Sequence, residues 1–259
     1  MYQNKSGFLS SIPPVTKNII IINVLLLLAT SVAERFGIDL NRYLGLHFFA
    51  SGNFNPVQLI TYMFMHGSFS HLFFNMFAVF MFGSTLEYVW GKKRYLIYYF
   101  ITGIGAALIQ ELVYEIRIHS IIQQLSPEIV MTVKNEGAAL LSTNRNYVDP
   151  LAGGLNLLMN SVTVGASGSI FGILLAFGML FPNSSLYVMF IPIPVKAKYF
   201  VIFYGLLELY LGIANYTGDN VAHFAHLGGM LFGFLMIIYW KKKDINDKNI
   251  NNDGRRFFR

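Results

Sequence analysis

The stretch GASGSIFGILLAFGMLF, residues 165–181, places a serine between glycines at the start of an apolar run without a single charged residue. Such a run predicts a helix that is apolar on all sides, and therefore buried in protein or lipid. From Ser167 to Phe181, at 1.5 Å per residue, the helix would cover roughly 22 Å, less than the roughly 30 Å of a bilayer core. We therefore expect a short membrane helix whose first residues lie sunken below the surface.

The composition predicts an integral membrane protein. Of the 259 residues, 54% are hydrophobic and 12% are charged, about half the charge of an ordinary soluble domain. Residues 43–86 and 150–195 contain no Asp, Glu, Lys or Arg. The absence of cysteine excludes disulfides, thiolate catalysis and cysteine metal sites. The net charge of +6 lies mostly at the ends of apolar runs, so it predicts topology and not a nucleic-acid partner.

Hydrophobic periodicity and length predict an all-α membrane protein with six spans. These are residues 18–33, 69–90, 95–114, 167–181, 199–214 and 221–240. With both termini cytoplasmic, the inside segments hold 14 of the 19 Lys and Arg residues, so the positive-inside rule selects this orientation. We expect a multi-pass protein of the cell membrane, with an uncleaved first span, cytoplasmic tails at 1–17 and 242–259, and disorder in the second tail.

Two outside segments are long. Residues 34–68 include an apolar stretch, 54–65, that is too short to cross a bilayer and is expected to lie partly within it. Residues 115–164 are more polar, and Ser126-Pro127-Glu128 has the pattern of a helix start. This insertion is either a small water-exposed lobe or an unstructured loop.

Spans two, four and six would all run from outside to inside, and each begins with unusual polar residues. His71 and Asn75 share one face at the start of span two, Ser167 opens span four, and His226 lies about one turn into span six. All four side chains are therefore expected at one depth, near the outer face. A shared depth predicts a single polar site.

The residues around Ser167 are suited to nucleophilic catalysis. Gly165 and Gly168 allow a peptide carbonyl to approach closely, and the free N–H groups of a helix start favour an anion. His226 is the candidate base for the serine hydroxyl. No carboxylate has a spacing that identifies it as a third member, although Asp219 and Glu208 are nearby in sequence.

Small residues predict that spans four and six pack closely. Gly168 and Gly172 on span four, and Gly229 and Gly233 on span six, follow the spacing of close helix pairs. His226 precedes Gly229 by three residues, so the packed face also carries the imidazole.

Other ionisable residues leave alternatives open. His47 and His119 are typical of loops, and His66 either joins the site or only stabilises the loop before span two. His223 competes with His226 as the base, but it precedes the small-residue face and is interpreted as structural. Glu208 at mid-span must be paired, protonated or facing water, and the sequence names no partner for it.

These motifs resemble those of the rhomboid family of intramembrane serine proteases. The matching segments are Gly165-Ala166-Ser167-Gly168, His71-x-x-x-Asn75 and Ala225-His226-x-x-Gly229-x-x-x-Gly233. The resemblance implies a six-helix rhomboid-like bundle over residues 18–241, with a membrane-embedded first loop and an extra lobe at 115–164. The Trp-Arg pair that many members carry in that loop is absent.

The resemblance also implies a role for each residue. Ser167 would be the nucleophile and His226 the base, forming a dyad without a carboxylate, with Phe171 packed against the imidazole. His71, Asn75 and the Ser167 N–H would hold the oxyanion. The implied activity is cleavage of single-pass membrane proteins near the outer face of the bilayer, without metal or organic cofactor.

Two other functions remain open. The first is a catalytically silent rhomboid-like protein that binds membrane clients. The second is a small proton-coupled transporter that uses Glu208 and the histidines as proton carriers.

Overall fold

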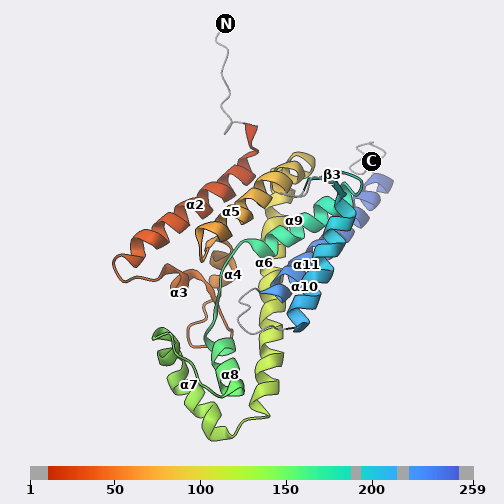
Figure 1. Cartoon of the computed structure of the whole chain (residues 1–259). Helices are drawn as coiled ribbons and strands as arrows, with labels where there is room; N and C mark the ends of the chain where they lie inside the picture. The colour runs from red at the N-terminus through yellow and green to blue at the C-terminus, as the bar shows by residue number, and fades with distance from the viewer. Residues whose placement is uncertain (1–10, 188–193, 215–221, 251–259) are drawn as a thin grey trace.

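A computed structural model describes residues 11–187, 194–214 and 222–250, with side chains described as far as residue 245. The described part of the chain is mostly helical and contains two short β-pairs (Figure 1). The helices are α2 (Pro14–Glu34), α3 (Leu40–Leu44), α4 (Gln58–Thr61), the 3₁₀ turn η1 (Tyr62–Phe64), α5 (Phe69–Ala78), the π-helical turn η2 (Val79–Gly83), α6 (Ser84–Ile122), α7 (Pro127–Ser142), α8 (Pro150–Asn160), α9 (Ser167–Leu180), α10 (Ala197–Ala214) and α11 (His223–Ile250). The strands are β1 (Leu46–His47), β2 (Val162–Thr163), β3 (Ser185–Leu186) and β4 (Val195–Lys196).

Among the described residues, four helical stretches are long and apolar enough to cross a membrane: Pro14–Glu34, Phe69–Ile122, Ala197–Ala214 and His223–Ile245. Helix α9 is apolar but shorter, as predicted. The stretch Phe69–Ile122 is interrupted at Gly91, whose φ of 77° leaves the helical region. The rings of Trp90 and Tyr98, 4.8 Å apart, pack across this turn. The stretch therefore contains two helical segments, which correspond to the predicted spans at 69–90 and 95–114.

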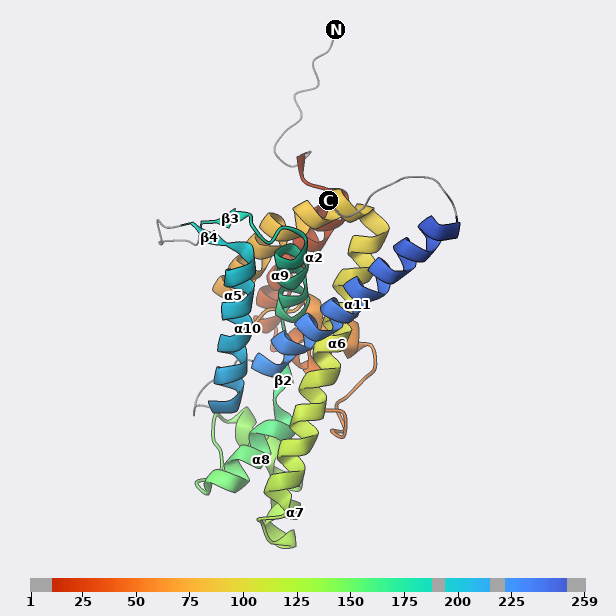
Figure 2. The same ribbon diagram turned by 90° about the vertical axis from the view of Figure 1, so that its right-hand side faces the viewer.

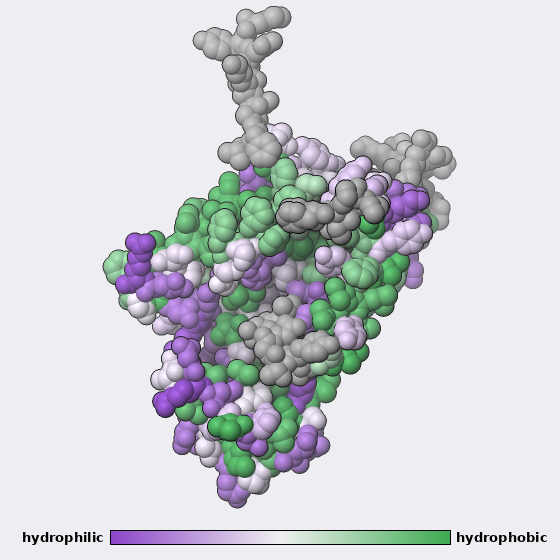
Figure 3. Space-filling view, in the orientation of Figure 1, coloured by the Kyte–Doolittle hydropathy of each residue, from purple (hydrophilic) through white to green (hydrophobic). Residues whose placement is uncertain are grey.

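The outer surface is apolar where a water-soluble protein would be polar. Leu28 on α2 is 58% exposed and Ile213 on α10 is 70% exposed. Figure 3 shows apolar residues over the part of the molecule where α2, α10 and α11 lie, and polar residues towards the lower end and at the upper end of α11. Lipid as the surrounding solvent accounts for this exposure. Together with the long apolar helices, it indicates an integral membrane protein.

Helix α6 passes next to α9 and α11 and fixes their positions (Figure 2). Its residues Tyr95, Tyr98 and Tyr99 are fully buried. The hydroxyl of Tyr98 donates to the Gly172 carbonyl at 2.8 Å, and Ser169 Oγ donates to the Tyr99 carbonyl at 2.8 Å. These bonds satisfy polar groups that have no water available, and they hold the start of α9 against α6.

Side-chain hydrogen bonds anchor the first loop. Gln58 Oε1 accepts from the backbone N–H of His47 at 3.3 Å and of Asn55 at 3.2 Å. Glu111, on α6, accepts from the Phe49 N–H at 2.8 Å. Strand β1 of this loop also pairs antiparallel with β2. The loop lacks a Trp-Arg pair, and buried Gln and Glu side chains anchor it instead.

The insertion at 115–164 is helical and not an unstructured loop. Helix α7 begins directly after Ser126, whose hydroxyl accepts from the Ile129 N–H, so the predicted helix start is confirmed. Helices α7 and α8 and the end of α6 share a hydrophobic cluster in which Val133 and Leu155 are fully buried. That cluster explains why the segment folds.

Several segments that were predicted to be cytoplasmic lie at one end of the molecule (Figure 1). Glu87 accepts hydrogen bonds from Thr16 at the start of α2, and Arg94 forms a bidentate ion pair with Asp244. Because of this ion pair, α11 is held against α6 beyond Trp240. Helix α11 continues past residue 242 to Ile250, and residues 251–259 lie outside the described part.

Candidate active site

Ser167 is the first residue of α9, and the backbone before it has a conformation that favours glycine. Gly165 has a φ of 128°, and its N–H donates to the Tyr62 carbonyl at 2.9 Å. A Cβ at Gly165 would lie 2.8 Å from His71 Cε1, inside van der Waals contact. Glycine is required here for both reasons. The backbone just before Ser167 thus lies next to the imidazole of His71.

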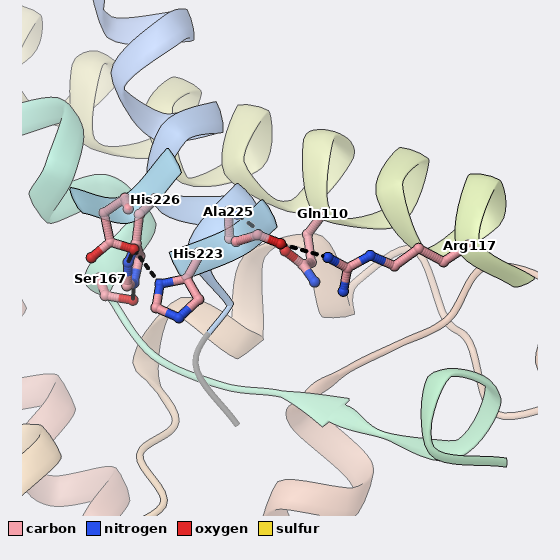
Figure 4. A network of polar contacts seen from close by, with 8 residues as sticks. Gln110, Arg117, Ser167, His223, Ala225 and His226 are labelled. Atoms are coloured by element: carbon pink, nitrogen blue, oxygen red, sulfur yellow. Dashed lines mark hydrogen bonds and ion pairs between the residues drawn. The ribbon is translucent and has the colours of Figure 1, made fainter. Parts of the chain in front are cut away.

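His226, on α11, lies directly against the serine. Its Nε2 is 2.8 Å from Ser167 Oγ (Figure 4). The two helices approach closely because Gly229 packs on the Gly168 carbonyl, where a Cβ would collide with backbone. The predicted close packing of α9 and α11 through small residues is therefore confirmed. Tight packing of glycines positions the hydroxyl and the imidazole within hydrogen-bond distance.

An aromatic ring packs against the face of the imidazole. The ring of Phe171, one turn after Ser167, stacks on His226 with centroids 4.2 Å apart and an interplanar angle of 9°. This is the contact that the resemblance implied for Phe171. Both rings are buried, so the stack limits rotation of the imidazole.

A carboxylate, unlike what the sequence led us to expect, also contacts His226. Glu208 Oε2, from α10, accepts from His226 Nδ1 at 2.9 Å and from His223 Nδ1 at 2.6 Å. All three side chains are buried. The sequence names no partner for Glu208, and the resemblance implies a dyad without a carboxylate; the other candidate, Asp219, lies outside the described residues. The available signals were a carboxyl at mid-span and two histidines three residues apart on one helix face.

The same three side chains could hold a metal ion. Glu208, His223 and His226 are a group of potential ligands whose atoms lie within 4.8 Å of one another. In the structure these atoms face each other in hydrogen bonds, and the Nε2 of His226 faces the serine.

The start of α11 is fixed from α6. Gln110 Oε1 accepts from the Ala225 N–H at 3.1 Å, and Arg117 donates to the Gly212 carbonyl at the end of α10 at 2.8 Å. Figure 4 shows Gln110 and Arg117 on one face of α6 beside Ala225 and the two histidines. The ends of α10 and α11 that flank the site are therefore both bonded to α6.

His66, His71 and Asn75 form a second polar group beside Ser167. Asn75 Nδ2 is 2.9 Å from His66 Nε2, and the rings of His66 and His71 meet edge to face at 4.9 Å. Burial, and then the neighbouring His71, lower the pKa of His66 to about 4. A neutral His66 accepts one N–H of Asn75, and the amide retains a second N–H. The position of a Cβ on Gly165 would be 3.7 Å from this amide nitrogen, so Asn75 also faces the backbone before Ser167.

A serine, an imidazole within hydrogen-bond distance, and N–H donors at a helix start are the parts of a hydrolytic site of the serine type. Comparison with known proteins gives the family. The Rhomboid domain matches residues 53–118 and 130–243, and the chain belongs to the rhomboid family.

Relatives with the family name are distant. The protein is 26% identical over 180 residues to RHOMBOID-like protein 6, mitochondrial, of Arabidopsis thaliana, which covers 69% of this chain and 42% of the plant protein. It is 25% identical over 182 residues to YdcA of Bacillus subtilis, a protein named as a candidate rhomboid protease. The matched region covers 69% of this chain and 64% of YdcA. An uncharacterized mitochondrial rhomboid protein of Schizosaccharomyces pombe is 25% identical over 205 residues. The matched region covers 72% of this chain and 52% of the yeast protein. The chain thus spans about half the length of these relatives.

Proposed function

We propose that this protein is an intramembrane serine endopeptidase that cleaves single-pass membrane proteins near the outer face of the bilayer. The observation that carries the proposal is the distance of 2.8 Å between Ser167 Oγ and His226 Nε2 at the start of α9. Six spans, cytoplasmic termini and a water-exposed lobe formed by α7 and α8 are part of the same proposal. The bilayer is the solvent, and no metal or organic cofactor takes part.

The proposed reaction begins with the serine. His226 Nε2 takes the proton of the Ser167 hydroxyl while Oγ bonds to the carbonyl carbon of the scissile peptide. The carbonyl oxygen becomes an oxyanion, which the Ser167 N–H, His71 and Asn75 would stabilise, each donor typically contributing about 10²- to 10³-fold in rate. His226 then gives its proton to the leaving amine. Water hydrolyses the resulting acyl-enzyme by the same steps and releases Ser167.

A spanning helix is a poor substrate until it unwinds. Its peptide bonds are shielded within the helix, so helix-breaking or small residues near the cut favour cleavage. A single-pass protein with such residues near the outer face is therefore the expected substrate class.

Purified protein in proteoliposomes with a model single-pass substrate provides the test. Cleavage by the wild-type protein and its loss in both Ser167→Ala and His226→Ala, with the cut mapped by mass spectrometry, would support the proposal. Cleavage that survives Ser167→Ala would contradict it. Binding of the substrate without cleavage, together with a Ser167 that does not react with a fluorophosphonate, would instead favour the silent client-binding protein.

The proton-coupled transporter is less well supported. Glu208 is bonded to two histidines, and one of them is bonded to Ser167, so the carboxylate belongs to the same site as the serine. A transporter predicts activity that survives Ser167→Ala and fails in Glu208→Gln, and proton flux in the same proteoliposomes distinguishes the two functions.

A further inference from the structure

The side chain of Glu208 lies behind the imidazole of His226, on the side away from Ser167. His226 contacts Ser167 through Nε2 and Glu208 through Nδ1, so hydroxyl, imidazole and carboxylate form a continuous chain of hydrogen bonds. We propose that Glu208 is a positioning residue for His226 and that it forms the third member of a serine-histidine-glutamate triad. This inference rests on the proposed function.

The carboxylate determines which imidazole nitrogen is protonated. An ionised carboxylate is only an acceptor, so a bond to Nδ1 requires the proton to be on Nδ1. Nε2 then carries the lone pair, and it faces the Ser167 hydroxyl that must be deprotonated. When His226 takes that proton it becomes a cation directly beside the Glu208 anion, which stabilises it. The group that accepts the proton is thus prepared before the reaction and stabilised during it.

His223 completes the surroundings of the carboxylate. A buried carboxylate is costly unless donors satisfy it, and a single oxygen of Glu208 accepts from both imidazoles, at 2.6 and 2.9 Å. His223 and His226 are three residues apart on α11, so both face the same side of the helix. His223 therefore fixes the carboxylate, and the carboxylate fixes His226.

The three contacts of His226, which lies on α11, come from two other helices. Ser167 and Phe171 belong to α9, and Glu208 belongs to α10. The stack with Phe171 limits the tilt of the ring, but two parallel rings attract each other equally well after a half-turn of the imidazole about χ2. A hydrogen bond to Nδ1 distinguishes the two orientations. Glu208 therefore selects one of the two ring orientations, which Phe171 alone does not distinguish.

The test compares Glu208→Gln with Glu87→Gln in proteoliposomes. Glu87 is a matched control because it is also a buried carboxylate within a helix, but it accepts hydrogen bonds from Val15 and Thr16. The readouts are kcat and KM for substrate cleavage and the rate at which a fluorophosphonate labels Ser167. In Glu208→Gln we expect kcat and the labelling rate to fall by roughly 10²- to 10⁴-fold. KM should change by less than about threefold, since the loss lies in the transition state.

Each outcome decides between the two proposals. Equal rates for Glu208→Gln and Glu87→Gln would overturn the positioning role while leaving the protease intact. Absence of cleavage and labelling in the wild-type protein would instead overturn the proposed function.

A second measurement decides the case if Glu208→Gln does not fold. In wild-type protein labelled with ¹⁵N-histidine, nuclear magnetic resonance identifies the protonated nitrogen of His226, with His226→Gln used to assign its signals. We expect a proton on Nδ1 in a strong hydrogen bond and none on Nε2 at neutral pH. A proton on Nε2 would overturn the inference without any change to Glu208.

Discussion

Phe171 and His226 lie face to face, with parallel rings 4.2 Å apart, although one belongs to α9 and the other to α11. Because the stack is worth about 0.5–1.5 kcal/mol, we expect Phe171→Leu to lower the rate of fluorophosphonate labelling of Ser167 by about 2- to 10-fold. Phe177→Leu is the control, since Phe177 is on the same helix and packs against Phe82 and Phe181. Equal labelling rates for the two variants would show that the stack does not orient His226.

Gly229 should tolerate no side chain. Its Cβ would overlap the carbonyl of Gly168, and backbone cannot move aside as a flexible side chain can. We expect Gly229→Ala to destabilise the protein by about 1–3 kcal/mol, and to reduce cleavage because the Ser167–His226 distance widens. The thermal unfolding midpoint in micelles and the labelling rate check these effects.

Gly154→Ala is the control for that experiment. A Cβ at Gly154, on α8, meets only Ile121 Cδ1 at an ordinary 3.8 Å. This variant should keep the wild-type labelling rate, and its unfolding midpoint should be equal to or slightly above that of the wild type, because alanine favours a helix interior over glycine. A Gly229→Ala protein that behaves in the same way would contradict the close approach of α9 and α11.

The membrane helices and the serine-histidine pair could be predicted from sequence because local patterns encode them. Apolar runs of sufficient length mark the spans, glycines at helical spacing mark the packed face, and Ser126 marks the start of α7. The order of the motifs places Ser167 and His226 at one depth. None of these inferences needs the angle at which any helix is rotated.

The contact of Glu208 with His226 could not be predicted because it depends on that angle. Residue 208 lies 18 positions before His226, on another helix, and only the rotation of α10 against α11 decides whether its carboxyl faces the site or lipid. The anchoring of the first loop by Glu111 has the same origin. The ion pair that joins α11 to α6 links residues 150 positions apart, Arg94 and Asp244, which no local pattern encodes.

Protonation of His66 should destabilise the protein in acid. The pKa of His66 is about 4 in the folded protein against 6.5 for an ordinary histidine, so below pH 6.5 the unfolded chain binds the proton more readily. The contribution of His66 to the free energy of unfolding is constant above pH 6.5. It falls as the pH drops towards 4, by up to about 3 kcal/mol. Unfolding free energies in micelles at pH 7 and pH 4.5 measure it.

His66→Gln isolates this effect from that of the other histidines. Glutamine also offers an acceptor to Asn75 but does not titrate. Its unfolding free energy should fall less between pH 7 and pH 4.5 than that of the wild-type protein. Identical decreases would mean that His66 is not the group responsible.

Glu87 should contribute to stability and not to catalysis. Its carboxylate accepts from the N–H groups of Val15 and Thr16 and from the Thr16 hydroxyl, at 2.7–2.9 Å, so it caps the start of α2 from another helix. An anion is favoured at a helix N-terminus. We expect Glu87→Gln to lower the unfolding free energy by about 1–2 kcal/mol with an unchanged labelling rate. A lowered labelling rate in a fully folded Glu87→Gln protein would show that Glu87 also affects the active site.

His223→Ala separates the carboxylate from its second donor. The variant removes one of the two hydrogen bonds to Glu208 Oε2 and leaves the bond from His226 Nδ1. Glu208 then keeps its hydrogen bond with His226 but loses the one from His223. We expect kcat to fall by about 10-fold, the effect of losing one hydrogen bond to a charged group. This decrease should be smaller than in Glu208→Gln. In the double variant His223→Ala/Glu208→Gln, kcat should fall no further than in Glu208→Gln alone, because His223 acts through the carboxylate. Losses that multiply in the double variant would mean that His223 reaches the serine by a route of its own.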